Sequence, residues 1–189
     1  MIIKLMRWLR AFITITAILS ITLPIPVFAA QCDEKSWNQS LTFQKRVDAW
    51  YNQQATKYND FLRLHNQRVL LQQQFSEQEL RRFWRTQKRI FINTMNAQIQ
   101  AANETVSQLD QQIHAVSDGA DIIDKAITHW RSINQQCEKE QQFINSATSL
   151  TYIQANQILK LEQEKLVSKL NQLKRIYQYE ADLLTKTQQ

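Results

Sequence analysis

Proline and glycine are almost absent from most of this chain, and their absence limits the folds open to it. Residues 31–189 contain no proline and a single glycine, Gly119. Average usage over that length would give roughly eight prolines and eleven glycines. Both residues make turns, and glycine also supplies the positive-φ positions that tight loops need. The sequence therefore predicts long helices joined by very few shaped loops.

The first thirty residues differ from the rest and predict an export signal. A basic start precedes an apolar stretch at 11–23, and the two prolines of the chain follow that stretch. Cleavage after Ala29 is the preferred interpretation, and cleavage after Ala30 is the second choice. An uncleaved membrane anchor is the alternative, although the apolar stretch is shorter than the ~20 residues of a comfortable span. We predict a cleaved signal at 1–29 and a single domain at 30–189.

Export changes how the charge of the chain is interpreted. The whole chain has a formal net charge of +6, and removal of the three cations that precede residue 11 lowers it to +3. A mildly basic exported protein rarely meets nucleic acid, so we expect no nucleic-acid partner. We expect the mature protein to be periplasmic or extracellular in a bacterium.

Two cysteines, Cys32 and Cys137, remain in the predicted mature chain. Disulfides persist in the oxidising compartments outside the cytosol. We expect these cysteines to pair within one chain; two free thiols or an intermolecular bridge are the alternatives. Neither cysteine has a CxxC or paired-histidine spacing, so we expect no metal site and no cofactor.

The spacing of apolar residues predicts an all-α fold. Apolar side chains recur at three- and four-residue steps, which places them on one face of each helix. We expect an elongated antiparallel bundle of three or four long helices with coiled-coil character. The predicted helices cover residues 37–75, 77–116, 121–145 and 150–186, with a bend or short break at 145–151.

Two helix boundaries rest on recognisable end signals. Ser76 and Glu79 match a capping box, in which each side chain bonds to the backbone N–H of the other residue. They predict that a new helix begins at Glu77; the alternative is one continuous helix of ~115 Å. Gly119 follows the second helix and can adopt the left-handed conformation of a helix end. We predict a tight hairpin reversal there.

The final predicted helix carries a heptad pattern of apolar residues, which is typical of a coiled-coil seam. We expect this seam to pack against another helix of the chain or to support self-association. Its members are Leu159, Leu166, Leu170, Leu173, Tyr177 and Leu184.

The densest charge cluster lies between residues 81 and 89. Five cations in nine residues would suit docking to an anionic membrane surface or to an acidic partner, with the tryptophan at the interface. The alternative is a solvated basic face with the tryptophan in the core. The candidate binding residues are Arg81, Arg82, Trp84, Arg85, Lys88 and Arg89.

No arrangement of residues in the sequence predicts catalysis. The three histidines are scattered, no carboxylate pair stands out, and P-loop, GxSxG and HExxH motifs are absent. Catalytic residues are usually displayed on shaped loops, which this chain almost lacks. An enzyme with a site inside the bundle core is therefore the third and weakest hypothesis.

We expect instead a non-enzymatic exported module for protein–protein interaction. Such a module would act as an adaptor, a chaperone or an accessory part of an envelope or secretion apparatus. The alternative is a secreted membrane-active protein or toxin that binds anionic lipid or lipopolysaccharide through the basic face between Arg81 and Arg89.

Overall fold

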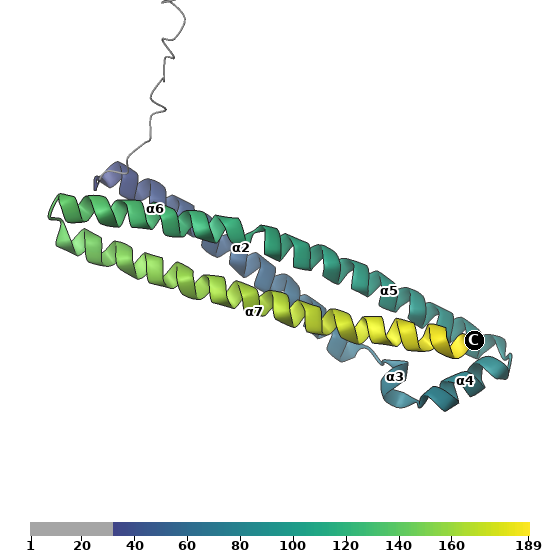
Figure 1. Cartoon of the computed structure of the whole chain (residues 1–189). Helices are drawn as coiled ribbons and strands as arrows, with labels where there is room; N and C mark the ends of the chain where they lie inside the picture. Colours follow the sequence, from purple (N-terminus) through teal and green to yellow (C-terminus); the bar gives the residue numbers. More distant parts are fainter. Residues whose placement is uncertain (1–31) are drawn as a thin grey trace, which may run out of the picture.

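The protein is an elongated helical bundle framed by one long hairpin (Figure 1). The computed structural model describes residues 32–189, so the predicted signal and its cleavage sites lie outside the described residues. The first arm of the hairpin is α5 (Arg89–Asp118) followed by α6 (Ala120–Lys139), and the second arm is α7 (Phe143–Gln188). At 1.5 Å per residue, α7 is ~70 Å long. The predicted all-α bundle is confirmed.

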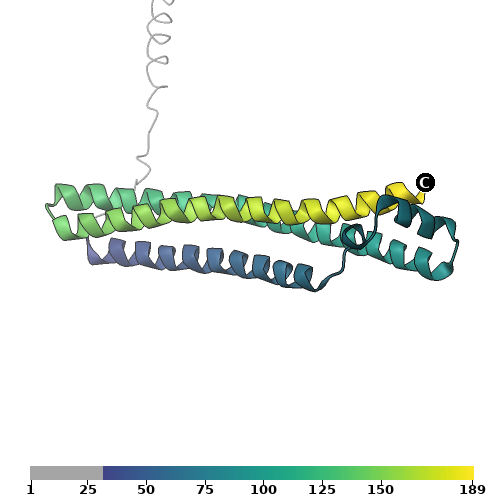
Figure 2. The same cartoon turned by 90° about the horizontal axis from the view of Figure 1, so that it is seen from below.

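Three further helices pack on this hairpin. α2 (Glu34–Gln67) lies beside α6 and α7 and runs in the same direction as α7 (Figures 1 and 2). α3 (Leu71–Gln74) and α4 (Glu77–Arg85) lie at the opposite end of the bundle from the α6–α7 turn. We call these two ends the α4 end and the hairpin end. α7 contacts all five other described helices, so it forms the centre of the bundle.

The core is an apolar seam that follows α7 along its length. Near the hairpin end, the fully buried Trp130 stacks on Tyr152 with ring centroids 4.1 Å apart. The Trp37 ring packs edge-on against Trp130 with a centroid distance of 5.3 Å. The predicted heptad residues continue this core and pack within the chain. Leu159 is partly buried, and the other five are buried: Leu166, Leu170, Leu173, Tyr177 and Leu184.

Polar side chains interrupt the apolar core, and they bond to one another. Gln44 and Asn156 donate reciprocally through their side-chain amides at 3.1 and 2.7 Å. Trp130 Nε1 donates to Gln44 Oε1 at 3.0 Å, and Gln112 Nε2 donates to Gln54 Oε1 at 2.8 Å. No buried side-chain nitrogen or oxygen in the described residues lacks a partner. Satisfied polar layers of this kind fix which helix faces meet.

The chain reverses at Glu140–Gln142, so the predicted hairpin at Gly119 is wrong. Gly119 has helical angles (φ −75°, ψ −8°), and α5 continues almost in line into α6 (Figure 2). At the true turn, Gln141 takes the left-handed conformation with φ 57°. The N–H of Gln142 donates to the C=O of Cys137 at 2.8 Å, which is the bond of a Schellman motif. A glutamine therefore does here what glycine usually does.

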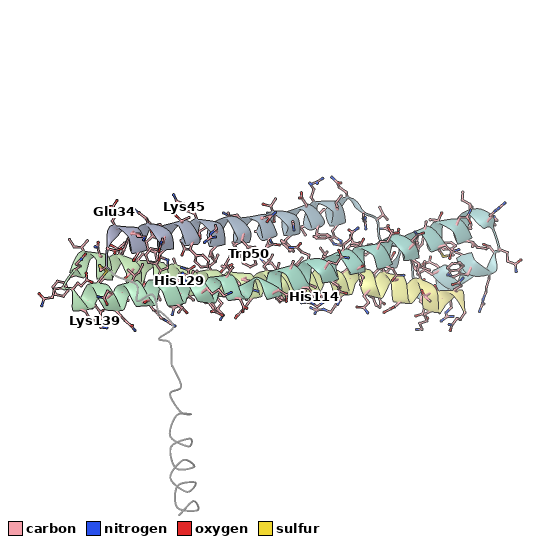
Figure 3. The ribbon with its side chains drawn as sticks, turned by 90° about the horizontal axis from the view of Figure 1, so that it is seen from above. Glu34, Lys45, Trp50, His114, His129 and Lys139 are labelled. Atoms are coloured by element: carbon pink, nitrogen blue, oxygen red, sulfur yellow. A yellow bond between two sulfur atoms is a disulfide. The ribbon has the colours of Figure 1, made fainter. Side chains whose placement is uncertain are left out.

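Gly119 is needed for close packing instead. A Cβ atom built on Gly119 would lie 1.9 Å from Cζ2 of Trp50 on α2. The indole lies between α2 and the backbone of the α5–α6 junction (Figure 3). The lone glycine of the predicted mature chain therefore lets α2 approach the hairpin.

Several other helix boundaries differ from the prediction. The first helix ends at Gln67 because the backbone becomes extended at Arg68 and again at Leu70. The predicted second helix is divided in two, since α4 ends at Arg85 and Gln87, with φ 50°, turns the chain into α5. The predicted third helix ends early at Lys139. The predicted break at 145–151 is wrong, because those residues lie within α7.

The capping box at Ser76 is confirmed. The Glu79 N–H donates to Ser76 Oγ at 3.3 Å, and the Ser76 N–H donates to Glu79 Oε2 at 2.8 Å. The bond from the Ser76 backbone lowers the pKa of the Glu79 carboxyl below its ordinary value. Both halves of the motif are local in sequence, which is why the sequence sufficed to find them.

Cys32 and Cys137 form the predicted intramolecular disulfide, with an S–S distance of 2.05 Å. The bond ties the start of α2 to the last turn of α6 at the hairpin end, and both residues are buried. Gln142 Nε2 donates to the Cys32 C=O at 3.1 Å, so the hairpin turn also contacts this junction. No described helix is both long and apolar enough to cross a membrane.

Candidate interaction surfaces

The predicted basic cluster lies at the α4 end and is divided by the α4–α5 turn. Arg81 pairs with Glu77 at 2.9 Å, and Lys186 of α7 pairs with the same carboxylate at 3.2 Å. The hydrogen bonds from Arg81 and then Lys186 lower the pKa of Glu77. The other cations are exposed and have no carboxylate within 4.0 Å in the described chain: Arg82, Arg85, Lys88 and Arg89.

The aromatic residues of this cluster are buried or partly buried, unlike its exposed cations. Trp84 is buried, and its Nε1 donates to Thr187 Oγ1 at 3.2 Å, so it lies in the core and not at the predicted interface. Phe83 stacks on Phe91 with ring centroids 5.1 Å apart. The exposed apolar side chain beside the cations is Ile90, at 71%. The structure thus separates a buried aromatic layer from a basic tip.

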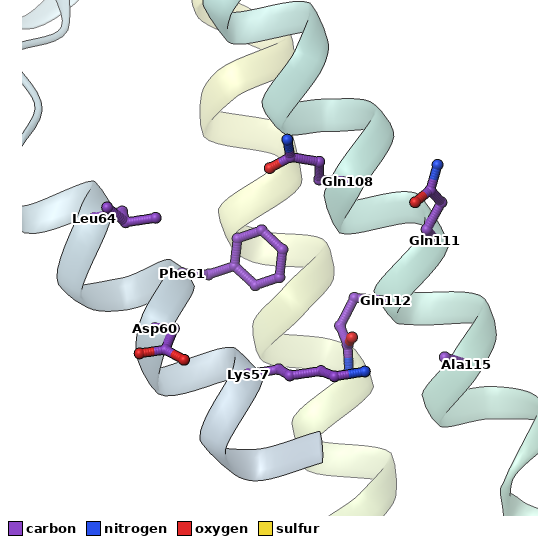
Figure 4. A pocket seen from close by; sticks show the side chains of 8 residues that line it. All are labelled: Lys57, Asp60, Phe61, Leu64, Gln108, Gln111, Gln112 and Ala115. Carbon is purple, nitrogen blue, oxygen red and sulfur yellow. The ribbon is translucent and has the colours of Figure 1, made fainter. Parts of the chain in front are cut away.

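A groove of about 450 Å³ opens between α2 and α5 (Figure 4). Phe61 points from α2 into the groove, and Gln108 and Gln112 lie on the opposite wall. Leu64 on α2 is 43% exposed. The groove exists because α2 leaves the hairpin before it reaches the α4 end, and the apolar pattern of α2 does not reveal that divergence.

The outer face of α7 near the hairpin end is a surface that the sequence predictions missed. Residues 141–159 contain no charged side chain, and no uncharged run in the described chain is longer. Of the eleven exposed large apolar residues in the described chain, four fall within this run of α7 and a fifth, Leu161, lies just beyond Lys160, which concentrates exposed apolar area on one surface. They are Phe143, Ile144, Leu150, Ile158 and Leu161, at 71, 83, 44, 60 and 56% exposure.

This surface follows a heptad register of its own. Six exposed residues recur at steps of 3, 4, 3, 4 and 3 along α7, and we call them the outer stripe: Ile144, Ala147, Thr151, Gln154, Ile158 and Leu161. Such spacing is typical of a helix face that packs against another helix. The signal was present in the sequence. The stronger leucine pattern that begins at Leu159 predicted only the buried seam, and the outer stripe on another face of the same helix was not predicted.

The titratable groups of the described chain form no compact site. The Tyr177 hydroxyl lies 3.3 Å from His65 Nδ1, and burial raises the pKa of Tyr177. His114 and His129 are exposed and lie far apart on α5 and α6 (Figure 3). The described residues contain no group of three or more His, Cys, Asp or Glu side chains placed to hold a metal ion.

No family model, curated protein or solved structure matches the chain. Evidence about function therefore comes from the surfaces described above.

Proposed function

We propose that this chain is a non-enzymatic, exported interaction module that binds other protein through its helical faces. An adaptor, a chaperone or an accessory part of an envelope or secretion apparatus would have these properties. The observation that carries the proposal is the outer stripe of α7. Exposed apolar surface concentrated on one face is characteristic of protein interaction sites.

The chemistry of the outer stripe favours a protein partner over a charged ligand. The stripe holds aliphatic side chains together with Thr151 and Gln154, and the nearest charged side chains on α7 are Lys160 and Glu162, the latter paired with Lys165. Lys160 is already paired with Asp124 of α6 at 2.7 Å. A helical partner with matching apolar spacing would cover the aliphatic groups and satisfy the two polar ones.

The disulfide supports export. A buried bond between Cys32 and Cys137 is stable in an oxidising compartment, whereas cytosolic thiols are kept reduced. We propose that residues 1–29 direct the chain out of the cytoplasm and are then removed. Mass spectrometry of the protein recovered from the cell envelope should give a mature chain that begins at Ala30 and carries no free thiol. A chain that retains residue 1 would contradict the cleavage proposal.

Site-specific photo-crosslinking in intact cells tests the interaction proposal. A photoreactive residue at Ile158 should yield a discrete crosslinked protein band. The matched control is Val69, which is similarly exposed at 66% but lies outside the stripe. Crosslinks only at Val69, or none at Ile158, would contradict the proposal.

A second candidate function rests on the basic tip at the α4 end. We propose as the alternative that the four unpaired cations bind an anionic lipid surface, with Ile90 entering the headgroup region. Liposome co-sedimentation should then require anionic lipid and weaken as salt rises. Replacement of Arg82, Arg85 and Arg89 by Gln should abolish binding, whereas Lys160→Gln, in the half of α7 nearer the hairpin end, should leave it unchanged. Binding to neutral liposomes at equal strength would contradict this alternative.

A further inference from the structure

We infer that the outer stripe of α7 is the interface of an antiparallel homodimer, in which a second copy of this chain presents the same stripe. This inference rests on the proposed function and deepens it by naming a partner. It is independent of the buried leucine seam, because that seam is already occupied within the chain.

The stripe becomes self-complementary when one copy is reversed. In a pair with two-fold symmetry, residue i of one copy meets residue j of the other, and j meets i. With the axis midway between positions 152 and 153, Ile144 of each copy meets Leu161 of the other. Ala147 and Ile158 then meet in the same way, so a small side chain faces a large one.

The polar residues of the stripe match in the same register. Thr151 and Gln154 are exposed, and the antiparallel arrangement brings each Thr151 opposite Gln154 of the other copy, next to the axis. Both side chains can donate and accept, so the pair can satisfy itself. All six stripe residues therefore find a suitable counterpart in one register.

The positions that flank the stripe from Ile144 to Ile158 are uncharged, and the first charged flanking residues, Glu162 and Glu164, lie beside Leu161. Thr148 and Ala155 lie on one side, and Leu150 and Gln157 lie on the other; all four are exposed and uncharged. Like charges across an interface would cost several kcal/mol. Residues 143–159 therefore bring no charge to the interface. At its Leu161 end, Lys160 is paired with Asp124 and Glu162 is paired with Lys165.

Charges outside the stripe favour the antiparallel over the parallel arrangement. The heptad positions of the stripe continue along α7 as Lys165 and Arg175, both exposed. A parallel pair would place each of these cations opposite the same residue of the other chain, so that like charges would meet. The antiparallel pair leaves Arg175 outside the overlap. It places Lys165, which is paired with Glu162 of its own chain at 2.7 Å, near the α6–α7 turn of the other copy, where Glu138, Lys139 and Glu140 are exposed.

The overlap determines the shape of the dimer. The stripe covers 18 residues, or ~27 Å of a helix ~70 Å long. Two copies would therefore join at their hairpin ends and point in opposite directions, so that both α4 ends remain free. A single stripe of this length is smaller than a standard interface, so the dimer should dissociate measurably on dilution.

Paired cysteines test the register directly. We would prepare Ile144→Cys and Leu161→Cys proteins separately, with the native disulfide intact, and oxidise them alone and mixed. Crosslinked dimer should form only in the mixture, because the antiparallel pair separates identical positions by ~25 Å along the helix, and a disulfide needs Cα atoms within ~7 Å. Self-crosslinking of Ile144→Cys alone would indicate a parallel pair and overturn the inference. A Val69→Cys protein mixed with either variant should form no dimer.

Analytical ultracentrifugation from ~1 µM to ~1 mM tests whether the dimer forms at all. The unmodified chain should shift from monomer to dimer across this range. I158E/L161E should remain monomeric with unchanged helical circular dichroism, because both side chains are already more than half exposed. Val69→Glu should dimerise normally. A chain that stays monomeric throughout would overturn the inference.

These results separate the dimer from the proposed function. A purified monomer whose Ile158 still crosslinks to a different protein in cells would overturn the dimer and leave the proposed function standing. A dimer in solution with no other crosslinked protein in cells would support the dimer, and it would contradict a role as an adaptor for another protein.

Discussion

The two ends of the bundle are held together in different ways. At the hairpin end, the disulfide between Cys32 and Cys137 ties α2 to α6 covalently. At the α4 end, the tie is a buried carboxylate. Glu180 on α7 is fully buried and accepts hydrogen bonds from the backbone N–H groups of Leu71 and Gln72 at 2.7 and 2.9 Å. Those N–H groups open the short helix α3, so one α7 side chain positions the whole connection between α2 and α4.

The outer surfaces of the two ends differ as well. The hairpin end presents an uncharged apolar face, whereas the α4 end presents unpaired cations beside the α4–α5 turn. One continuous helix, α7, runs through both ends. The difference therefore comes from local composition and from the neighbours of each half of α7, not from a change of fold. Substitutions at each end should show whether the disulfide and the Glu180 hydrogen bonds stabilise their own ends independently.

Removal of the disulfide should have the largest effect. Closing a loop of 105 residues is worth ~4–5 kcal/mol in the chain-entropy model. We expect Cys32→Ala/Cys137→Ala to lower the free energy of unfolding by an amount of this order, measured by urea denaturation. Hydrogen exchange should rise mainly in α2 near the hairpin end. Uniformly faster exchange in α3 and α4 would show that the two ends are not independent.

Replacement of the buried carboxylate should come next. Glu180→Ala leaves the backbone N–H groups of Leu71 and Gln72 without their acceptor, whereas Gln98 Nε2 keeps its bond to the Val69 C=O; a buried donor left unsatisfied costs ~1–3 kcal/mol. We expect a loss of ~3 kcal/mol, with faster amide exchange at Leu71 and Gln72. Glu180→Gln keeps one acceptor and should lose less. Equal losses of unfolding free energy in the two variants would show that the hydrogen bonds of Glu180 do not account for its contribution to stability.

Gly119→Ala should have an intermediate effect, centred on the middle of the bundle. The helical angles of Gly119 accept alanine, but the new Cβ would overlap the Trp50 ring. Overpacking of this kind costs ~1–3 kcal/mol. Near-ultraviolet circular dichroism and urea denaturation should show a displaced indole and a less stable protein. In the Trp50→Ala background, Gly119→Ala should instead be neutral or stabilising, because alanine is the better helix former.

The capping box at the α4 end should give the smallest effect. Ser76→Ala should lower the free energy of unfolding by ~1 kcal/mol. The pKa of Glu79 is lowered in the folded chain, so its contribution is present above the ordinary carboxyl pKa and is lost as pH falls through the lowered value. Thermal denaturation between neutral and acidic pH should show this loss in the unmodified chain. Ser76→Ala should make the stability less dependent on pH, because it removes the hydroxyl that donates to the Glu79 carboxylate.

Features that depend on residues close in sequence were predictable. The capping box needs only Ser76 and Glu79. The disulfide was preferred over two free thiols or an intermolecular bridge because the chain has two cysteines and a predicted export signal. The heptad pattern also predicted a packed seam, and of its leucines only Leu159 is partly rather than fully buried. In each case the information lies in a short pattern or in the cysteine count and the predicted export signal.

The errors arose where a distant partner decides the local structure. The sequence predicts a turn at Gly119 because glycine usually marks one. The glycine is needed instead to make room for Trp50, which lies on a different helix. The real turn at Gln141 carries no glycine signal. Among the candidate binding residues, Trp84 is buried against α7, where it bonds to Thr187, 103 residues away in sequence. The pairing of Arg81 with Glu77 is different, because a spacing of four residues is readable from the sequence.

The central position of α7 also bears on when the chain can fold. The other five described helices all contact α7, and all of them precede it along the chain. Until residues beyond 142 have been synthesised, none of them has this partner, although α2 and α6 can already contact each other. Cys137 emerges only shortly before α7 does. The disulfide can therefore form only after residue 137 has been made, and the core can be completed only after α7 has followed.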